Sequence, residues 1–103
     1  MALAIVFLRF LHHARARLDA FEVLALKGTR KILELLKAKD QMRYSELVNA
    51  IGFSTTTSRA LKAMETAKLV NRQVLDEPYR PVAYSLTEKG RKLSQLVAEI
   101  EKL

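Results

Sequence analysis

Two short helical segments joined by one tight turn lie in the middle of the chain, between residues 45 and 67. Ser45 is a suitable N-cap for the first segment, and Ser54 for the second, which runs to about Ala67. Gly52 stands between them, at a position where a left-handed backbone conformation ends a helix. Because so little chain separates the two segments, they must pack directly against each other. The sequence therefore predicts a helix–turn–helix pair at the centre of the fold.

The second of these segments has two chemically different faces. At 100° per residue, its small apolar face is formed by Thr57, Ala60, Leu61, Met64 and Ala67. The opposite face carries hydroxyl groups, one guanidinium group and one ammonium group, which bind phosphates and base edges in the major groove of duplex DNA. An ordinary solvated helix face is the alternative. We predict a DNA-contacting surface formed by Ser54, Thr55, Thr56, Ser58, Arg59, Lys62 and Thr66.

A β-hairpin is predicted after this helical pair. Alternating apolar and polar residues over 69–75 and 82–86 indicate two antiparallel strands with one buried face. The loop over 76–81 is stiffened by two prolines and presents a tyrosine and an arginine near its tip. A basic, rigid hairpin of this kind can lie on the DNA backbone or in a minor groove. Two acids in the same loop favour the alternative, a plain connecting turn. The residues predicted to contact DNA from the hairpin are Arg72, Tyr79 and Arg80.

The other segments of the central region are bounded by recognisable signals. Gly28 ends a preceding helix and Thr29 caps the next one, which runs to about Ala38. The dipeptide at residues 40–41 is expected to turn the chain. Thr87 is a suitable N-cap for a last helix. The core of the domain is therefore expected over residues 28–86.

Apolar residues at helical spacing continue at both ends of the chain, over residues 3–25 and 93–103. A core of this size cannot cover both stripes, and soluble monomers rarely expose such patches. We therefore expect a homodimer whose interface is formed by an N-terminal helix within residues 1–26 and a C-terminal helix within residues 87–103. In the alternative, the two helices cover each other within one monomer. The predicted interface residues are Leu3, Phe7, Phe10, Leu11, Leu18, Phe21, Leu93, Leu96, Val97 and Ile100.

Positive charge is concentrated in the central part of the chain. The whole sequence has a formal net charge of +7, and residues 27–92 carry 14 basic and 7 acidic residues. This excess favours a polyanionic partner, most often nucleic acid. A membrane-surface helix would instead need its basic residues beside the apolar N-terminal stripe, and the apolar run over residues 1–8 is too short to span a bilayer. We expect no membrane partner and a cytoplasmic location.

The sequence contains no constellation that supports catalysis. It has no cysteine, which excludes disulfides, cysteine-based zinc sites and thiol redox switching. His12 and His13 are adjacent, about 100° apart on a helix, whereas chelation needs a spacing of three or four residues. The three glycines are isolated and form no phosphate-binding loop. We expect no enzyme activity, no metal site and no cofactor.

Four short motifs within residues 29–93 form a recognisable set: Ser45-Glu46-Leu47, Gly52-Phe53-Ser54 followed by Leu61, Leu69-Val70-Asn71-Arg72, and Pro81-Val82-Ala83-Tyr84-Ser85-Leu86-Thr87-Glu88-Lys89-Gly90. Together they resemble the winged-helix regulators of the HxlR-like and MarR-like families, and the last motif is the most specific. The resemblance implies a mainly α fold of the α+β class, a winged helix-turn-helix with extra N- and C-terminal helices that form a dimer interface.

The same resemblance implies a homodimer that binds a pseudo-palindromic operator in double-stranded DNA, with the helix over residues 54–67 in the major groove. HxlR-like proteins that sense reactive compounds use a cysteine near the N-terminus, and this sequence has none. The resemblance therefore implies transcription regulation but identifies no small-molecule effector. Two alternatives stay open: an architectural DNA-binding protein with weak sequence preference, and a winged helix that binds a protein or RNA.

Overall fold

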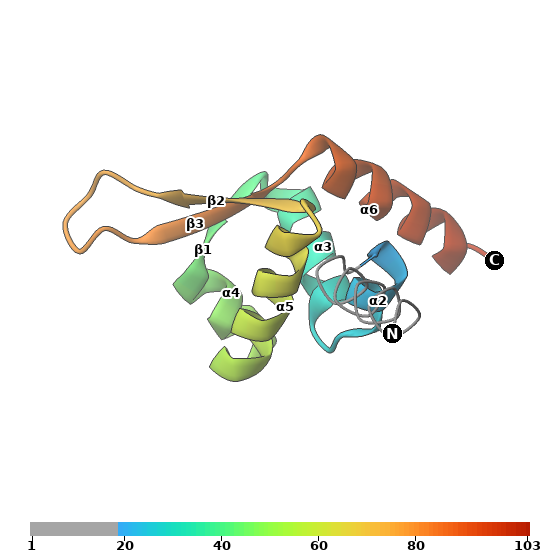
Figure 1. Cartoon of the computed structure of the whole chain (residues 1–103), viewed down its shortest axis with the longest axis horizontal. Coiled ribbons are helices and arrows are strands. Elements are labelled where there is room, and N and C mark those ends of the chain that lie inside the picture. Colours follow the sequence, from blue (N-terminus) through green and yellow to red (C-terminus); the bar gives the residue numbers. More distant parts are fainter. Residues whose placement is uncertain (1–18) are drawn as a thin grey trace, which may run out of the picture.

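The computed structural model describes residues 19–103, which form helices on one side of a small sheet (Figure 1). Leu3, Phe7, Phe10, Leu11 and Leu18, predicted at a dimer interface, lie outside the described residues, as do His12 and His13. The elements in chain order are α2 (Ala20–Ala25), α3 (Thr29–Lys39), β1 (Gln41–Arg43), α4 (Tyr44–Ile51), α5 (Ser54–Thr66), β2 (Val70–Val74), β3 (Val82–Leu86) and α6 (Glu88–Glu101). This order confirms the predicted α+β fold.

The core lies where α3, α4 and α5 pack together against the sheet. Ile32 of α3, Leu47 of α4 and Met64 of α5 are completely buried and come from three different helices. The predicted apolar face of α5 is confirmed, because all five of its residues are buried, including Thr57. The Thr57 hydroxyl donates a 2.8 Å hydrogen bond to the carbonyl of Phe53, which satisfies a polar group that would otherwise be costly to bury. The opposite face of α5 is left exposed.

The sheet contains a third strand that the sequence analysis missed. Its order is β1–β3–β2, with both pairings antiparallel. Residues 40–41 were predicted as a simple turn, but only Asp40 turns the chain, with a positive φ of 56°, and Gln41 begins β1. The strand pairs Met42 with Tyr84 and buries the methionine in the core. Three residues are too few to show a readable alternation, which is why the sequence did not reveal the strand.

The predicted burial pattern of the hairpin is wrong for its first strand. In β2, Val70 is buried but the four residues from Asn71 to Val74 are all exposed. β2 is an edge strand, and the hairpin extends beyond the helices that cover the base of the sheet (Figure 1). Both of its faces therefore meet solvent toward the tip. We call residues 70–86, the two strands with their loop, the wing.

The start of α6 is joined tightly to the turn between α5 and β2. The Thr87 hydroxyl donates to the carbonyl of Lys68 at 2.6 Å and accepts from the N–H of Gly90 at 3.0 Å, so the predicted Thr87 cap is confirmed. The ammonium group of Lys89 donates to the carbonyl of Ala67 at 2.9 Å, and the Thr87 N–H donates to the carbonyl of Leu69 at 3.0 Å. These contacts explain the local sequence Thr87-Glu88-Lys89-Gly90 as a structural junction.

Four predicted helix boundaries are wrong. Thr29 does not cap α3, because it is the first residue of the helix and Gly28, with a left-handed backbone, stands at the N-cap. The single helix expected over residues 3–25 does not run through Asp19, because this residue has an extended backbone and caps α2 by accepting from the Glu22 N–H at 2.9 Å. α4 begins two residues earlier than expected, so its N-cap is Arg43 and not Ser45. The N-cap of α5 is Phe53 and not Ser54. At Asp19, Arg43 and Phe53 the capping residue has an extended backbone, which residue type alone does not specify.

Candidate nucleic-acid interface

The exposed face of α5 is an open hollow without acidic residues. Ser54, Thr55, Ser58, Arg59 and Lys62 line it, so the structure brings five of the seven residues predicted on this helix into one surface. Among residues 19–103, neither Arg59 nor Lys62 takes part in a salt bridge. Their positive charges are therefore available to an external anion.

The other two predicted residues of α5 lie apart from this hollow. Thr56 is half-buried and faces α3, where its side chain packs beside Gly28. Thr66 is exposed near the end of the helix, and its hydroxyl donates to the Lys62 carbonyl at 3.0 Å. Thr56 therefore does not belong to the exposed DNA-contacting face that the sequence predicted. Its position on the wheel is intermediate, and packing against α3 decides which way it faces.

Tyr44 is a polar contact of this face that the sequence analysis missed. It is the first residue of α4, and its hydroxyl forms a hydrogen bond with the hydroxyl of Ser58 in α5. The bond fixes the position of one hydroxyl group on the α5 face and leaves Tyr44 itself at the edge of the hollow. No local pattern predicts such a pair, because its two residues meet only when α4 and α5 pack.

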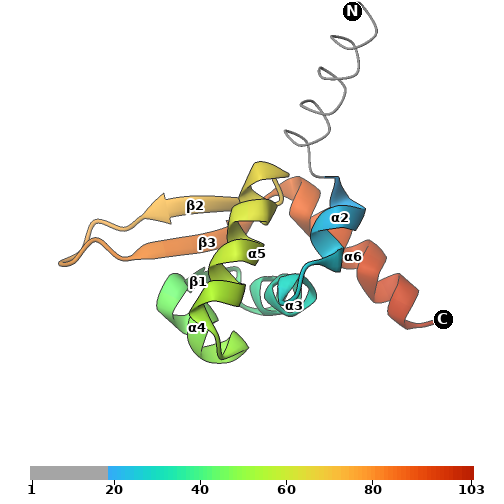
Figure 2. The ribbon, with the colours of Figure 1, turned by 60° about the horizontal axis from the view of Figure 1, so that its bottom comes forward.

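The wing projects from the body as a narrow hairpin, on the opposite side from the C-terminal half of α6 (Figure 2). At its tip, the Arg80 N–H donates to the Glu77 carbonyl at 2.9 Å, with Pro78 at the second position of the turn. Tyr79 and Arg80 both have positive φ, 69° and 44°, an unfavourable conformation for residues with side chains. The turn holds the Tyr79 side chain entirely in solvent.

One of the two acids in the wing loop is paired with a cation. A single nitrogen, Nη2 of Arg43, lies 2.7 Å from Oε1 and 2.9 Å from Oε2 of Glu77. Arg43 ends β1 and caps α4, so the contact joins the wing loop to the start of the helix–turn–helix pair. From the sequence alone, the charge of Glu77 was expected to disfavour DNA contact by the wing. Its pairing removes much of that objection, because the negative charge is compensated locally.

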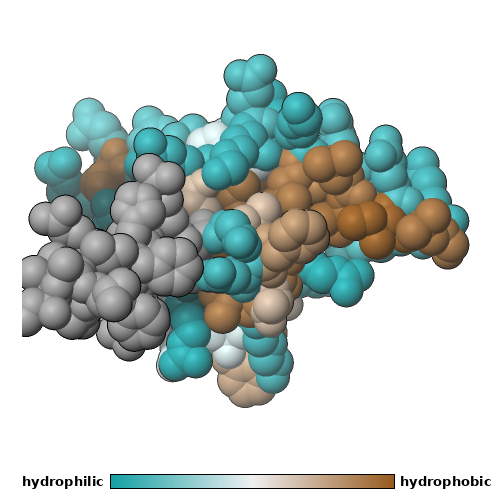
Figure 3. Space-filling model, turned by 45° about the vertical axis from the view of Figure 1, so that its right-hand side comes forward, coloured by the Kyte–Doolittle hydropathy of each residue, from teal (hydrophilic) through white to brown (hydrophobic). Residues whose placement is uncertain are grey.

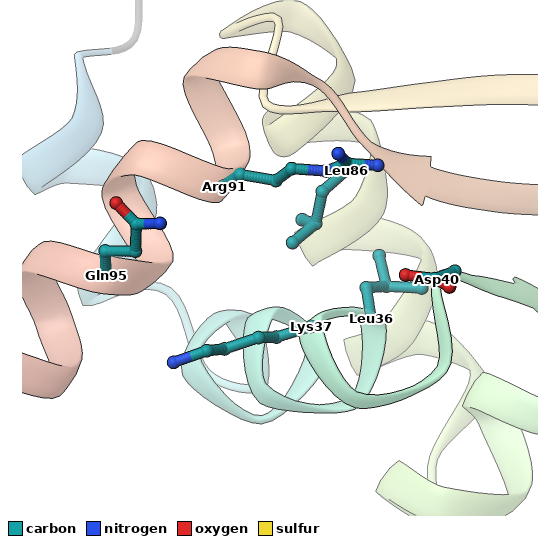
Figure 4. A pocket seen from close by; sticks show the side chains of 6 residues that line it. All are labelled: Leu36, Lys37, Asp40, Leu86, Arg91 and Gln95. Carbon is teal, nitrogen blue, oxygen red and sulfur yellow. The ribbon is translucent and has the colours of Figure 1, made fainter.

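A second hollow lies between α3, β3 and α6 (Figure 4). Leu36 and Leu86 form its apolar part, and two cations, Lys37 and Arg91, stand on its walls. Figure 4 shows Arg91 extending toward Leu86 while Lys37 extends the opposite way. The two cations therefore do not converge on one point. Over residues 19–103 the chain also has no cluster of three potential metal-ligating side chains, and no helix long and apolar enough to cross a membrane.

An apolar surface lies on the outer side of α6, and Figure 3 shows a hydrophobic band on the face that carries this helix. Leu96 and Ile100 are 48% and 60% exposed, and Leu103 is fully exposed. Two other predicted interface residues face inward: Leu93 packs against the core, and Val97 lines a hollow beside α3. The predicted seam is therefore split between two faces. Phe21 of α2 is also largely exposed.

Comparison with solved structures gives relatives of the same fold. The reduced form of the transcriptional regulator YodB from Bacillus subtilis is 30% identical, with a TM-score of 0.71, and the match covers 81% of this chain and 82% of that one. A transcriptional regulator of the MarR family from Porphyromonas gingivalis W83 is 28% identical, with a TM-score of 0.68 and the same coverage of both chains. Both neighbours support the assignment of a winged helix.

Sequence comparison agrees with the structural neighbours. The HTH-type transcriptional regulator YdzF of Bacillus subtilis (strain 168) is 36% identical over 76 residues, which cover 72% of this chain and 70% of that protein. The family model for the HxlR-like helix-turn-helix matches residues 23–103, which include every element from α3 to α6. The chain thus belongs to the HxlR-like helix-turn-helix family of transcriptional regulators.

Proposed function

We propose that this protein regulates transcription by binding one short sequence in double-stranded DNA as a homodimer, with α5 in the major groove and the wing on the backbone or in the minor groove. The observation that carries the proposal is the acid-free hollow on α5, where Arg59 and Lys62 stand without ion-pair partners among the described residues. The family membership and the regulator relatives support the same function.

The residues on the α5 face divide into two chemical roles. Arg59 can donate two parallel hydrogen bonds to the O6 and N7 atoms of a guanine, which reads sequence. Lys62 and the hydroxyl groups of Ser54, Thr55 and Ser58 suit phosphates, which position the helix without reading sequence. From the wing, Arg72, Tyr79 and Arg80 are proposed to contact the backbone or the minor groove. We also propose a cytoplasmic location.

A selection of bound fragments from the protein's own genome tests this proposal. The selected fragments should share one short motif, and affinity for that motif should exceed affinity for random duplex by about 10³-fold or more. An architectural protein would enrich no motif and would bind all duplexes alike. A protein- or RNA-binding module would show little salt-dependent affinity for duplex DNA. Either of these two results contradicts the proposal.

The interface of the proposed homodimer is the apolar surface on the outer side of α6. Leu96, Ile100 and Leu103 recur at four- and three-residue spacing, which forms a seam suited to another helix. A second copy of the chain that packs along this seam would cover it by two-fold symmetry. The same pairing can place two α5 helices about 34 Å apart, one turn of DNA. The half-sites of the operator should then be separated by one helical turn.

Replacing Ile100 by glutamate should abolish the dimer at micromolar concentration, because two unpaired charges would be buried at the seam. A buried charge left without its ion-pair partner costs about 3–5 kcal/mol, and the cost here is expected to be of that order. Light scattering on the full chain measures the mass directly. Gln95→Glu adds the same charge beside the α3–α6 hollow and should leave the dimer intact. A monomeric parent protein, or a dimeric Ile100→Glu variant, would show that this face is not the interface.

A further inference from the structure

The structure also points to a positioning device, and this inference rests on the DNA-binding function proposed above. We infer that Arg43 and Glu77 form a strap that holds the wing at a fixed angle to α5, so that both elements meet DNA together. The strap places the wing and need not touch a base. The negative charge of Glu77 suggests that this residue opposes DNA binding. In the inferred strap, Glu77 instead favours binding, because it holds the wing in place.

Arg43 is well placed to act as an anchor. Its backbone pairs with Ala83 in β3, and its N–H donates to the Glu46 carboxylate at 2.9 Å. The residue is thereby fixed between the sheet and the first turn of α4. From this fixed point its guanidinium group reaches both carboxylate oxygens of Glu77, at 2.7 and 2.9 Å. Charge-assisted bonds of this length are among the strong ones on a protein surface.

The next residue along the chain makes the matching contact to α5. Tyr44 follows Arg43 directly, and its hydroxyl is bonded to Ser58 on the DNA-facing side of the helix. Adjacent residues thus hold the two elements proposed to meet DNA, one through a carboxylate and the other through a hydroxyl group. Among the side-chain hydrogen bonds of residues 19–103, those of Arg43 are the ones that tie the wing loop to the rest of the molecule. The base of the hairpin is held in addition by the pairing of β3 with β1 and by the packing of Val70, Tyr84 and Leu86 in the core.

The charge of Glu77 provides a sharp test of this role. An acid near the tip of a DNA-contacting wing repels phosphate, so simple electrostatics predicts that its neutralisation tightens binding. The strap predicts the opposite, because a freed wing must be ordered again when DNA binds. Asp76 is the matched control: it is the neighbouring acid in the same loop, it is exposed, and it forms no salt bridge within the described residues.

The experiment compares Glu77→Gln, Asp76→Asn, Arg43→Gln and the double variant Arg43→Gln/Glu77→Gln in the full chain. Fluorescence anisotropy with the selected duplex measures affinity. Glu77→Gln should weaken binding about two- to fivefold, the range expected for an exposed ion pair, whereas Asp76→Asn should leave binding unchanged or tighten it. In the Arg43→Gln background, Glu77→Gln should cause no further weakening, because the pair is already broken.

A second readout does not depend on DNA. Backbone ¹⁵N relaxation of the free protein should show faster motion of residues 76–80 in Glu77→Gln, with α5 unaffected and Asp76→Asn unchanged. If Glu77→Gln tightens binding as Asp76→Asn does, or if its wing is as ordered as the parent's, the strap is refuted. If none of the proteins binds a specific duplex, the proposed function fails, and the relaxation data still decide whether the pair restrains the wing.

Discussion

Replacing Arg59 by alanine is expected to weaken binding to the specific site by about 1–3 kcal/mol, roughly 5- to 150-fold. Arg59 stands on the open face of α5 without an ion pair among the described residues, so both of its terminal donors can reach one guanine. The variant should also lose its preference at a single base pair. Anisotropy with the selected duplex and its single-base variants measures both effects.

Lys62→Ala should give a different result from the same face. Lys62 is proposed to bind phosphate, so its loss should weaken binding to all duplexes alike. The slope of log K against the logarithm of the salt concentration should become shallower by about one. Arg91→Ala is the control, since it removes a positive charge from α6 at the α3–α6 hollow, away from the α5 face. If Arg59→Ala binds the specific site as tightly as Arg91→Ala while its fold persists, α5 is not the reading helix.

Replacing Gly90 by alanine should destabilise the fold by about 3 kcal/mol or more, near the upper end of single-residue effects. A Cβ atom at this position would lie 2.1 Å from the carbonyl oxygen of Leu69. That oxygen belongs to the backbone and accepts the Thr87 N–H, so it cannot move aside without breaking the junction between α6 and the α5–β2 turn. Urea unfolding followed by circular dichroism measures the loss.

Gly52→Ala provides the comparison for this prediction. Gly52 has a φ of 98°, and a Cβ atom there would meet nothing within 4 Å. The substitution should therefore cost only the backbone penalty of a left-handed residue, about 1 kcal/mol. A Gly90→Ala variant no less stable than Gly52→Ala would mean that the backbone at Leu69 can shift at little cost in free energy. The close approach at Leu69 would then not constrain the fold.

The two faces of α5 could be predicted because the signals that define them are local. The spacing of Thr57, Leu61 and Met64 identifies the buried side of α5, and the polar residues opposite follow from the same geometry. The Thr87 cap and the left-handed Gly52 are likewise determined within one helical turn. Helical periodicity was thus sufficient to predict the residues that line the α5 hollow, on which the proposed function rests.

The supporting contacts could not be predicted because they join distant parts of the chain. Arg43 and Glu77 are separated by 34 residues, and Tyr44 and Ser58 by 14. Each pair exists only after the sheet and the helices have packed. The orientation of the apolar residues of α6 could not be predicted for the same reason. Their spacing indicates a helix, but packing against α3 decides that Val97 faces inward and Ile100 outward.

Amide chemical-shift mapping with the selected duplex tests the central claim most directly. The largest changes are expected on α5 at Ser54, Thr55, Ser58, Arg59 and Lys62, with a second group in the wing loop over residues 76–80. A random duplex should produce smaller changes that salt removes. Changes concentrated on the outer side of α6 or in the α3–α6 hollow, with α5 unaffected, would contradict the assignment of α5 and the wing as the DNA-binding surface.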